Sequence, residues 1–96
     1  MTQPIMQKFC LYVAGDAPNS AQAIANLKAI CRTHLADRHQ IEVVDVFLEP
    51  KRAQADGILM TPTLIKLTPA PARRIVGTLS QLAPVLQALG LETLPA

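Results

Sequence analysis

A chain of 96 residues with nine basic and seven acidic side chains has a net charge of +2, too small and too dispersed to predict binding to nucleic acid. Half of the residues are apolar but only 3% are aromatic, so one small core must be built from Leu, Ile, Val and Ala. No apolar run approaches the ~18 residues that span a bilayer, and residues 1–7 lack the apolar stretch of a signal peptide. We expect a single α/β domain over residues 1–96, cytoplasmic and without membrane contact.

The first half of the chain predicts a strand, a helix and a second strand. Residues 9–13 are an uninterrupted apolar run that ends at an Ala-Gly pair, as in a central strand covered on both faces. A long helix follows, capped by Asn19 or Ser20, with apolar residues at three- and four-residue spacing up to residues 37–39. Residues 41–47 are rich in valine and predict a strand parallel to the first, because a helix separates the two.

The second half predicts a short helix, a hairpin and a last helix. Pro50 pre-sets the first helical turn, and Gly57 ends the short helix. Residues 63–67 form the third expected strand, and a Pro-rich connection returns the chain as an antiparallel strand at residues 74–76. Residues 82–89 carry a helical apolar stripe. The resulting order is βαβαββα.

A proline at the entrance of the third strand, Pro62, points to a fold. Proline has no amide hydrogen for a sheet ladder, so it belongs at a strand's first residue or in the turn before it, and Thr61-Pro62 is a candidate cis bond. A Thr-Pro step that enters a strand after a strand-helix-strand unit is typical of thioredoxin-like domains. Where a thioredoxin carries Cys-x-x-Cys, residues 14–20 contain no cysteine. Without a thiolate to attack a disulfide, the scaffold is expected to serve binding.

The two cysteines, Cys10 and Cys31, are predicted in the middle of a strand and deep in a helix. Catalytic cysteines lie at helix N-termini, where the helix dipole lowers the thiol pKa. We therefore expect two small buried hydrophobes, and a thioredoxin- or glutaredoxin-like redox protein is the enzyme alternative. His34 and His39 have no cysteine or carboxylate at ligand spacing, so we expect no metal and no cofactor.

Several colinear motifs run through almost the whole chain. They are Leu11-Tyr12-Val13-Ala14-Gly15 with Pro18-Asn19-Ser20, Val44-Asp45-Val46, Ile58-Leu59 with Thr61-Pro62-Thr63-Leu64, and Arg73-Arg74-Ile75-Val76-Gly77 before Leu79-Ser80. With these motifs the chain resembles the KaiB family of circadian-clock proteins. The resemblance implies a non-enzymatic protein that binds the KaiC ATPase ring, regulates its phosphorylation cycle, recruits KaiA there and competes with the sensor domain of the kinase SasA. A stand-alone sensor-like module that docks to a histidine kinase is the alternative.

The resemblance also implies two folds for residues 50–96. Family members can occupy a ground state, often tetrameric, with the order βαββααβ, and a monomeric thioredoxin-like state with a mixed four-stranded sheet and the order βαβαββα. Ala88 stands where the family usually has glycine, and Gly90 where it usually has aspartate. Ala in place of Gly inside a helix stabilises it by about 1 kcal/mol, and Gly defines a helix end. We therefore expect the thioredoxin-like fold and a monomer.

The partner-binding surface implied by the resemblance consists of the loop after the first strand, the short helix and the Thr-Pro step. Its candidate residues are Ala14, Gly15, Asp16, Lys51, Arg52, Met60 and Thr61, beside Pro62. Ordinary turn chemistry explains the same residues as an alternative. Lys66, Arg73 and Arg74 are further candidates as one basic patch on the hairpin, although an edge protected against strand pairing would carry the same charges.

Two positions depart from the family in a way that concerns the partner. Gln22 and Gly57 stand where the clock proteins usually carry basic residues near the surface that faces KaiC. Charges across an interface raise the association rate and the specificity more than they affect the fold. We therefore expect the chain to bind a standard KaiC more slowly and with lower specificity. A divergent KaiC, or another ATPase or kinase, is the alternative partner.

Overall fold

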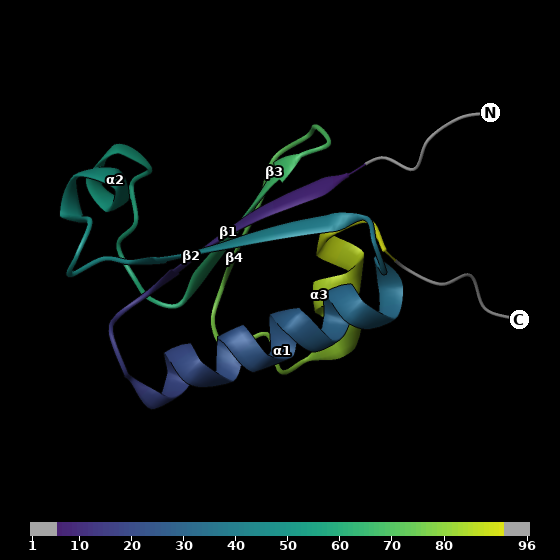
Figure 1. Cartoon of the computed structure of the whole chain (residues 1–96), viewed down its shortest axis with the longest axis horizontal. Coiled ribbons are helices and arrows are strands. Elements are labelled where there is room, and N and C mark those ends of the chain that lie inside the picture. The colour runs from purple at the N-terminus through teal and green to yellow at the C-terminus, as the bar shows by residue number, and fades with distance from the viewer. Residues whose placement is uncertain (1–5, 92–96) are drawn as a thin grey trace, which may run out of the picture.

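The computed structural model describes residues 6–91 as a four-stranded mixed sheet with helices on both faces (Figure 1). The elements are β1 (Gln7–Val13), α1 (Pro18–His34), β2 (His39–Asp45), α2 (Pro50–Ala55), β3 (Thr63–Thr68), β4 (Arg73–Val76) and α3 (Leu82–Ala88). The strands lie in the order β2-β1-β3-β4, with β2 parallel to β1, β3 antiparallel to β1, and β4 antiparallel to β3. The predicted order βαβαββα is confirmed.

The central strand β1 sends its side chains into two cores. Phe9, Leu11 and Val13 belong to the core on the side of α1 and α3, whereas Cys10 and Tyr12 belong to the core on the side of α2. All five side chains are buried. This burial on both faces explains why the strand has no polar residue in its middle.

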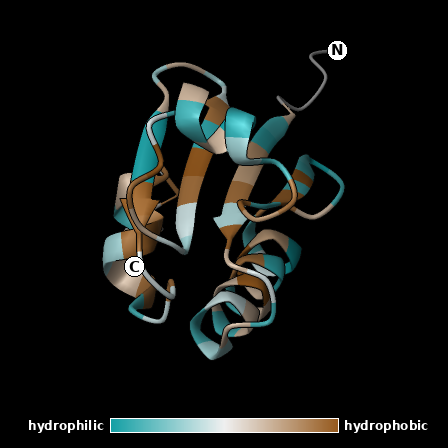
Figure 2. Cartoon of the chain, turned by 90° about the vertical axis from the view of Figure 1, so that its left-hand side faces the viewer, coloured by the Kyte–Doolittle hydropathy of each residue, from teal (hydrophilic) through white to brown (hydrophobic). Residues whose placement is uncertain are grey.

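The larger core lies between the sheet and the two helices α1 and α3, and the smaller core lies beneath α2. In Figure 2 the hydrophobic residues are concentrated along the strands, between the helices. Ala53 is the buried residue of α2, so this short helix covers only part of its sheet face. Within the described part of the chain, no helix has both the length and the apolar character needed to cross a membrane.

The strand β2 ends at Asp45, two residues before the predicted end. The Asp45 carboxylate accepts a hydrogen bond from the Phe47 amide at 2.9 Å, and the Asp45 carbonyl accepts hydrogen bonds from the amides of Leu48 and Glu49 at 3.0 and 2.9 Å. Asp is one of the residues whose side chain competes with the sheet ladder in this way. The prediction that the strand includes residue 47 is therefore wrong, and Phe47 lies in a turn.

The helix α1 begins at Pro18, earlier than a cap at Asn19 or Ser20 would allow. Proline fits the first helical position because its fixed φ suits a helix and its missing amide hydrogen would have no partner there. Ser20 lies instead in the first turn, where its hydroxyl accepts a hydrogen bond from the Ala14 amide at 3.1 Å. The predicted cap is wrong, but the serine ties the loop after β1 to the helix.

The helix α3 ends at a glycine, as predicted. Gly90 has a φ of +72° and its amide donates to the Gln87 carbonyl at 3.1 Å, while the Leu91 amide donates to the Leu86 carbonyl at 2.7 Å. This pair of bonds is the Schellman arrangement, in which a residue in the left-handed region closes a helix. Pro84 lies in the first turn, where it breaks no helical hydrogen bond.

Candidate partner-binding surface

Three loops meet at the end of the sheet where β1 and β2 finish and β3 starts. The strand pairings fix this end, since Val13 pairs with Asp45 and Tyr12 with Thr63. A Cβ added to Gly15 would lie 3.6 Å from the Phe47 ring, so the first two loops are in contact. We call this surface the docking end and define it as Ala14, Gly15, Asp16, Phe47, Leu48, Lys51, Leu59, Met60, Thr61 and Pro62. In Figure 1 it lies on the left, around α2.

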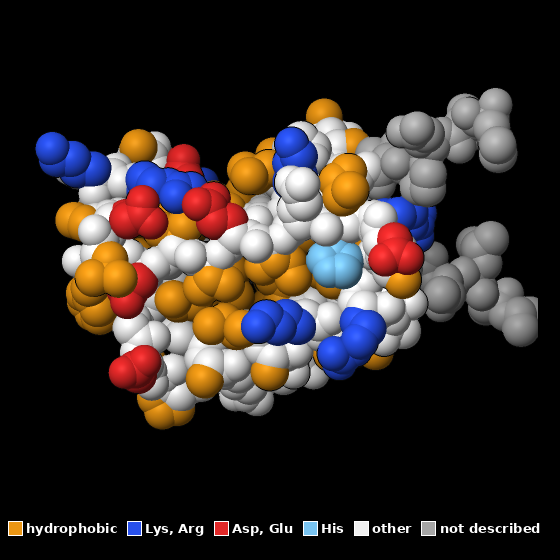
Figure 3. All heavy atoms as spheres, viewed as in Figure 1, with side chains coloured by type: hydrophobic (Ala, Val, Ile, Leu, Met, Phe, Trp, Pro, Cys, Tyr) orange, Lys and Arg blue, Asp and Glu red, His pale blue; other side chains and the backbone are white. Residues whose placement is uncertain are grey.

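Large apolar side chains are exposed at the docking end. Phe47 and Leu48 are 72% and 80% exposed, and Leu59 and Met60 are 94% and 64% exposed. Figure 3 shows hydrophobic side chains on this left-hand side, among acidic groups. An exposed apolar patch rimmed by polar groups marks an interaction surface. Of these four residues only Met60 is predicted from the sequence, and the signal for Phe47 and Leu48 is the turn-forming Asp45 that precedes them.

Polar contacts hold α2 on the sheet. The Arg52 guanidinium donates two hydrogen bonds to the Glu42 carboxylate of β2, at 2.7 and 2.8 Å, and this contact lowers the pKa of Glu42. The buried Tyr12 hydroxyl donates to the Asp56 carboxylate and lies 3.4 Å from the Arg52 carbonyl. Burial and the bond to Asp56 raise the pKa of Tyr12, so the hydroxyl keeps its proton. Arg52, predicted as a partner contact, therefore has a contact inside the protein.

Arg74 reaches the turn after α2 from β4. Its guanidinium donates to the Asp56 carbonyl at 2.7 Å and to the Gly57 carbonyl at 3.3 Å. Lys66 and Arg73 are partners in the β3–β4 register and lie on the other sheet face, because side chains alternate along a strand. Lys66 is also only 6% exposed. The single basic patch expected from these three residues is therefore split between two faces, and only Arg74 reaches the turn that enters the docking end.

The main chain at the start of β3 is held at several points. The Thr61–Pro62 bond is cis, and Pro62 is buried. The Thr63 hydroxyl donates to the Met60 carbonyl at 2.6 Å, and the Gly77 amide donates to the Pro62 carbonyl at 2.9 Å. The backbone of Met60 is thus fixed while its side chain is exposed to solvent. A group on a backbone that is already ordered loses less conformational entropy when it is buried.

A family comparison matches the KaiB domain over residues 10–91. This chain belongs to the KaiB family. It is 45% identical over 85 residues to the circadian clock protein KaiB3 of Synechocystis sp., covering 88% of this chain and 81% of that protein. It is 46% identical over 84 residues to the circadian clock oscillator protein KaiB of Synechococcus elongatus, covering 88% and 80%.

Solved structures of other proteins share the fold of this KaiB-family chain. The N-terminal domain of Synechococcus elongatus SasA matches with a TM-score of 0.73 at 20% identity, over 100% of this chain and 94% of that one. Chloroplastic thioredoxin z matches with a TM-score of 0.70 at 14% identity, over 94% and 98%. At such identities the likeness concerns the fold alone. The predicted thioredoxin-like fold is confirmed.

Both cysteines of this KaiB-family chain are free and buried, as predicted. Burial raises the pKa of the Cys10 thiol, and it raises the pKa of the Cys31 thiol to about 11. A thiol that keeps its proton near neutral pH is a poor nucleophile. The geometry therefore disfavours the redox alternative. In residues 6–91, moreover, no three His, Cys, Asp or Glu side chains gather as metal ligands would.

Proposed function

We propose that this protein is a non-enzymatic clock or signalling regulator that binds a KaiC-type ATPase ring through its docking end and thereby regulates the phosphorylation cycle of the ring. The observation that carries the proposal is the set of exposed apolar side chains at the end of a thioredoxin-like fold where β1 and β2 finish and β3 starts. Membership of the KaiB family supports the choice of partner.

The residues of the docking end have different parts in this proposal. Phe47 and Met60 supply the apolar area, and full burial of each side chain is worth about 1.5–3 kcal/mol. The exposed charges of Asp16 and Lys51 orient the partner and set the association rate more than the affinity. Arg52 and Arg74 act through α2, because they hold the helix and the turn after it in place.

The proposal includes the state in which the protein acts. The competent form is the thioredoxin-like monomer, and a tetramer with the order βαββααβ is the competing ground state. Ala88 and Gly90 favour the competent form because they stabilise α3 and its end. KaiA is a second partner that joins the complex, and a SasA-like kinase competes for the ring.

A second candidate function is that of a sensor-like module that docks directly to a histidine kinase. The observation in its favour is the likeness of the fold to the N-terminal domain of SasA. The two functions differ in the protein that the docking end contacts, so one binding experiment with both partners separates them.

The test is a binding assay of the full chain with the KaiC-type ATPase and with the histidine kinase of the source organism. Met60→Glu places a charge in the apolar patch and is expected to abolish binding to the ATPase. Leu67→Glu is the matched control, because Leu67 is also exposed, at 47%, but lies toward the other end of β3. Failure of the wild-type chain to bind the ATPase, or an unchanged affinity of Met60→Glu, would contradict the proposal.

A further inference from the structure

A concave basic surface lies at the end of the molecule opposite the docking end. A pocket of about 400 Å³ is lined by Lys28, Arg32, Ala36, Asp37 and His39, and we call it the α1 pocket. It lies between the second half of α1 and the start of β2, whereas the docking end lies where β1 and β2 finish. In Figure 3 several Lys and Arg side chains and a His lie on this right-hand half, while most acidic side chains of the view lie on the left-hand half.

The sequence builds the α1 pocket from one helix and the turn that follows. Lys28 and Arg32 are four residues apart in α1, so they lie one turn apart on the same exposed face. Asp37 has a φ of +62° and turns the chain back toward the sheet. The Nδ1 atom of His39 lies 2.7 Å from the Leu35 carbonyl oxygen, so the imidazole is held beside the end of the helix.

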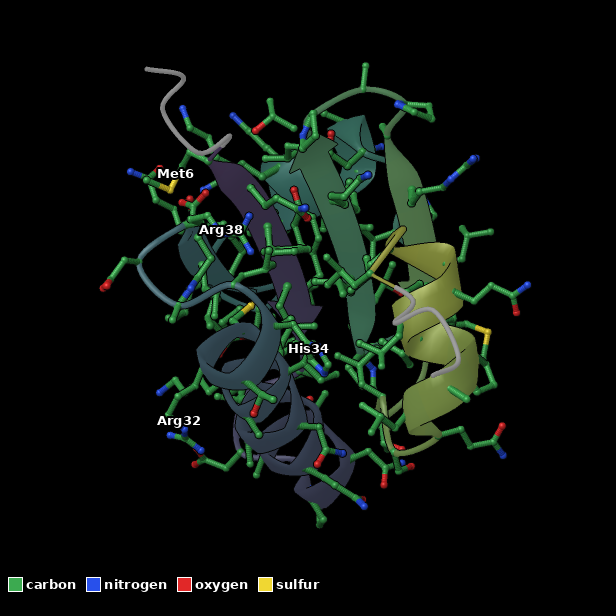
Figure 4. All side chains as sticks on the ribbon, turned by 90° about the vertical axis from the view of Figure 1, so that its right-hand side faces the viewer. Met6, Arg32, His34 and Arg38 are labelled. Carbon is green, nitrogen blue, oxygen red and sulfur yellow. The ribbon has the colours of Figure 1, made fainter. Side chains whose placement is uncertain are left out.

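A further guanidinium lies next to the α1 pocket. Arg38 donates a hydrogen bond to the carbonyl of His34, the last residue of α1, at 3.0 Å. Figure 4 shows Arg32, His34 and Arg38 around the end of α1, with Arg32 and Arg38 well apart in this view. The positive charges therefore come from both sides of the turn between α1 and β2.

The stability of the helix end explains only part of this charge, and it does not explain Lys28. In residues 6–91 both ion pairs involve Arg52, so the cations of the α1 pocket have no carboxylate partner there, and Asp37 is the one acid in the pocket lining. Two cations four residues apart repel each other on a helix. The helix dipole explains Arg32, in the last turn, but not Lys28, which lies before it.

We propose that the α1 pocket binds an acidic segment of a partner protein, with carboxylates seated between Lys28, Arg32 and His39. Nucleic acid is the less suitable ligand, because the net charge is only +2 and no Phe, Tyr or Trp side chain lines the pocket to stack on bases. The proposal is independent of the proposed function. Since the two surfaces lie at opposite ends, both can be occupied at once.

The experiment is an NMR titration of the isotope-labelled full chain with a short oligo-glutamate peptide, without any ATPase. We expect amide shifts centred on residues 28–39 and an affinity that falls as salt is added. Lys28→Glu and Arg32→Glu are each expected to weaken binding roughly fivefold, because charge reversal removes one attraction and adds one repulsion. Arg32→Lys is expected to keep the affinity.

The matched control is Lys8→Glu. It changes the net charge equally, but strand alternation places Lys8 with Cys10, on the sheet face opposite α1. Lys28→Glu should fold normally, since it places a Glu four residues before Arg32, a stabilising arrangement on a helix. Equal weakening by Lys8→Glu, shifts centred on Lys51 instead of residues 28–39, or tighter binding of inorganic phosphate or a single-stranded oligonucleotide would overturn the proposal.

Discussion

Residues at the end of α3 are expected to decide which fold the second half of the chain adopts. Gly90→Asp places a side chain where φ is +72°, and since no atom lies within 4 Å of an added Cβ, the cost is conformational and amounts to about 1 kcal/mol. Ala88→Gly at the last residue of α3 costs up to about 1 kcal/mol of helix propensity. Together the two substitutions shift the equilibrium away from this fold by about 2 kcal/mol, or roughly 30-fold.

The assay is NMR of the double variant combined with size-exclusion chromatography. Secondary chemical shifts for residues 82–89 are expected to lose helical character while the apparent mass rises, because topology and oligomeric state change together. Ala25→Gly is the matched control, since it weakens the exposed face of α1, which both folds share. The reasoning is refuted if the double variant only melts earlier and keeps helical shifts, as Ala25→Gly should.

Three further predictions concern the packing around α2 and α1. Tyr12→Phe removes a hydroxyl that is hydrogen-bonded to the Asp56 carboxylate, and a hydrogen bond to a charged group is worth about 1.5–3 kcal/mol. Because the exposed Asp56 can be hydrated instead, we expect the free energy of unfolding, measured by urea denaturation, to fall by about 1.5 kcal/mol. Burial raises the pKa of the Cys31 thiol from 9.0 to about 11, so the protonated thiol stabilises the folded state fully below about pH 9, and this stabilisation is lost as the pH rises through about 11. The urea midpoint of the wild-type chain should therefore fall over this pH range, whereas the midpoint of Cys31→Ala should lack this fall. Arg74→Met should speed amide hydrogen exchange at Gly57 and at the residue after it, with little change in exchange of β1.

The parts of the fold that follow from periodicity were predictable. The apolar run of β1, the helical spacing of α1 and the glycine after α3 each report a local preference that the tertiary structure keeps. The end of β2 was not predictable, because the valine-rich pattern continues past Asp45. Only the hydrogen bonds of the turn that Asp45 begins show where the strand stops. The start of α1 was missed because Pro18 at the first helical position outweighed the usual cap residues.

The candidate surface was predictable only in part. Gly15, Met60 and Pro62 follow from the resemblance to a family, whereas the exposure of Phe47 and Leu59 depends on how two loops pack, which a sequence pattern does not report. An apolar residue beside a strand is read as core by default. Hence Phe47 was assigned to a strand, and of the four exposed apolar residues only Met60 was predicted at this surface.

We expect the contacts of α2 to couple the docking end to the choice between the two proposed folds. Arg74 holds the turn after α2 from β4. In the proposed ground state residues 50–96 are rearranged, so we expect the docking end to be complete only in the βαβαββα state. A partner that binds this state alone stabilises it by about 2.7 kcal/mol at a concentration of 100 times its Kd. This exceeds the roughly 2 kcal/mol lost in the Ala88→Gly, Gly90→Asp double variant. Saturating amounts of the KaiC-type ring should therefore restore helical shifts to residues 82–89, with a lower apparent affinity than for the wild-type chain. A ring that binds both chains equally well would show that binding and fold are not coupled.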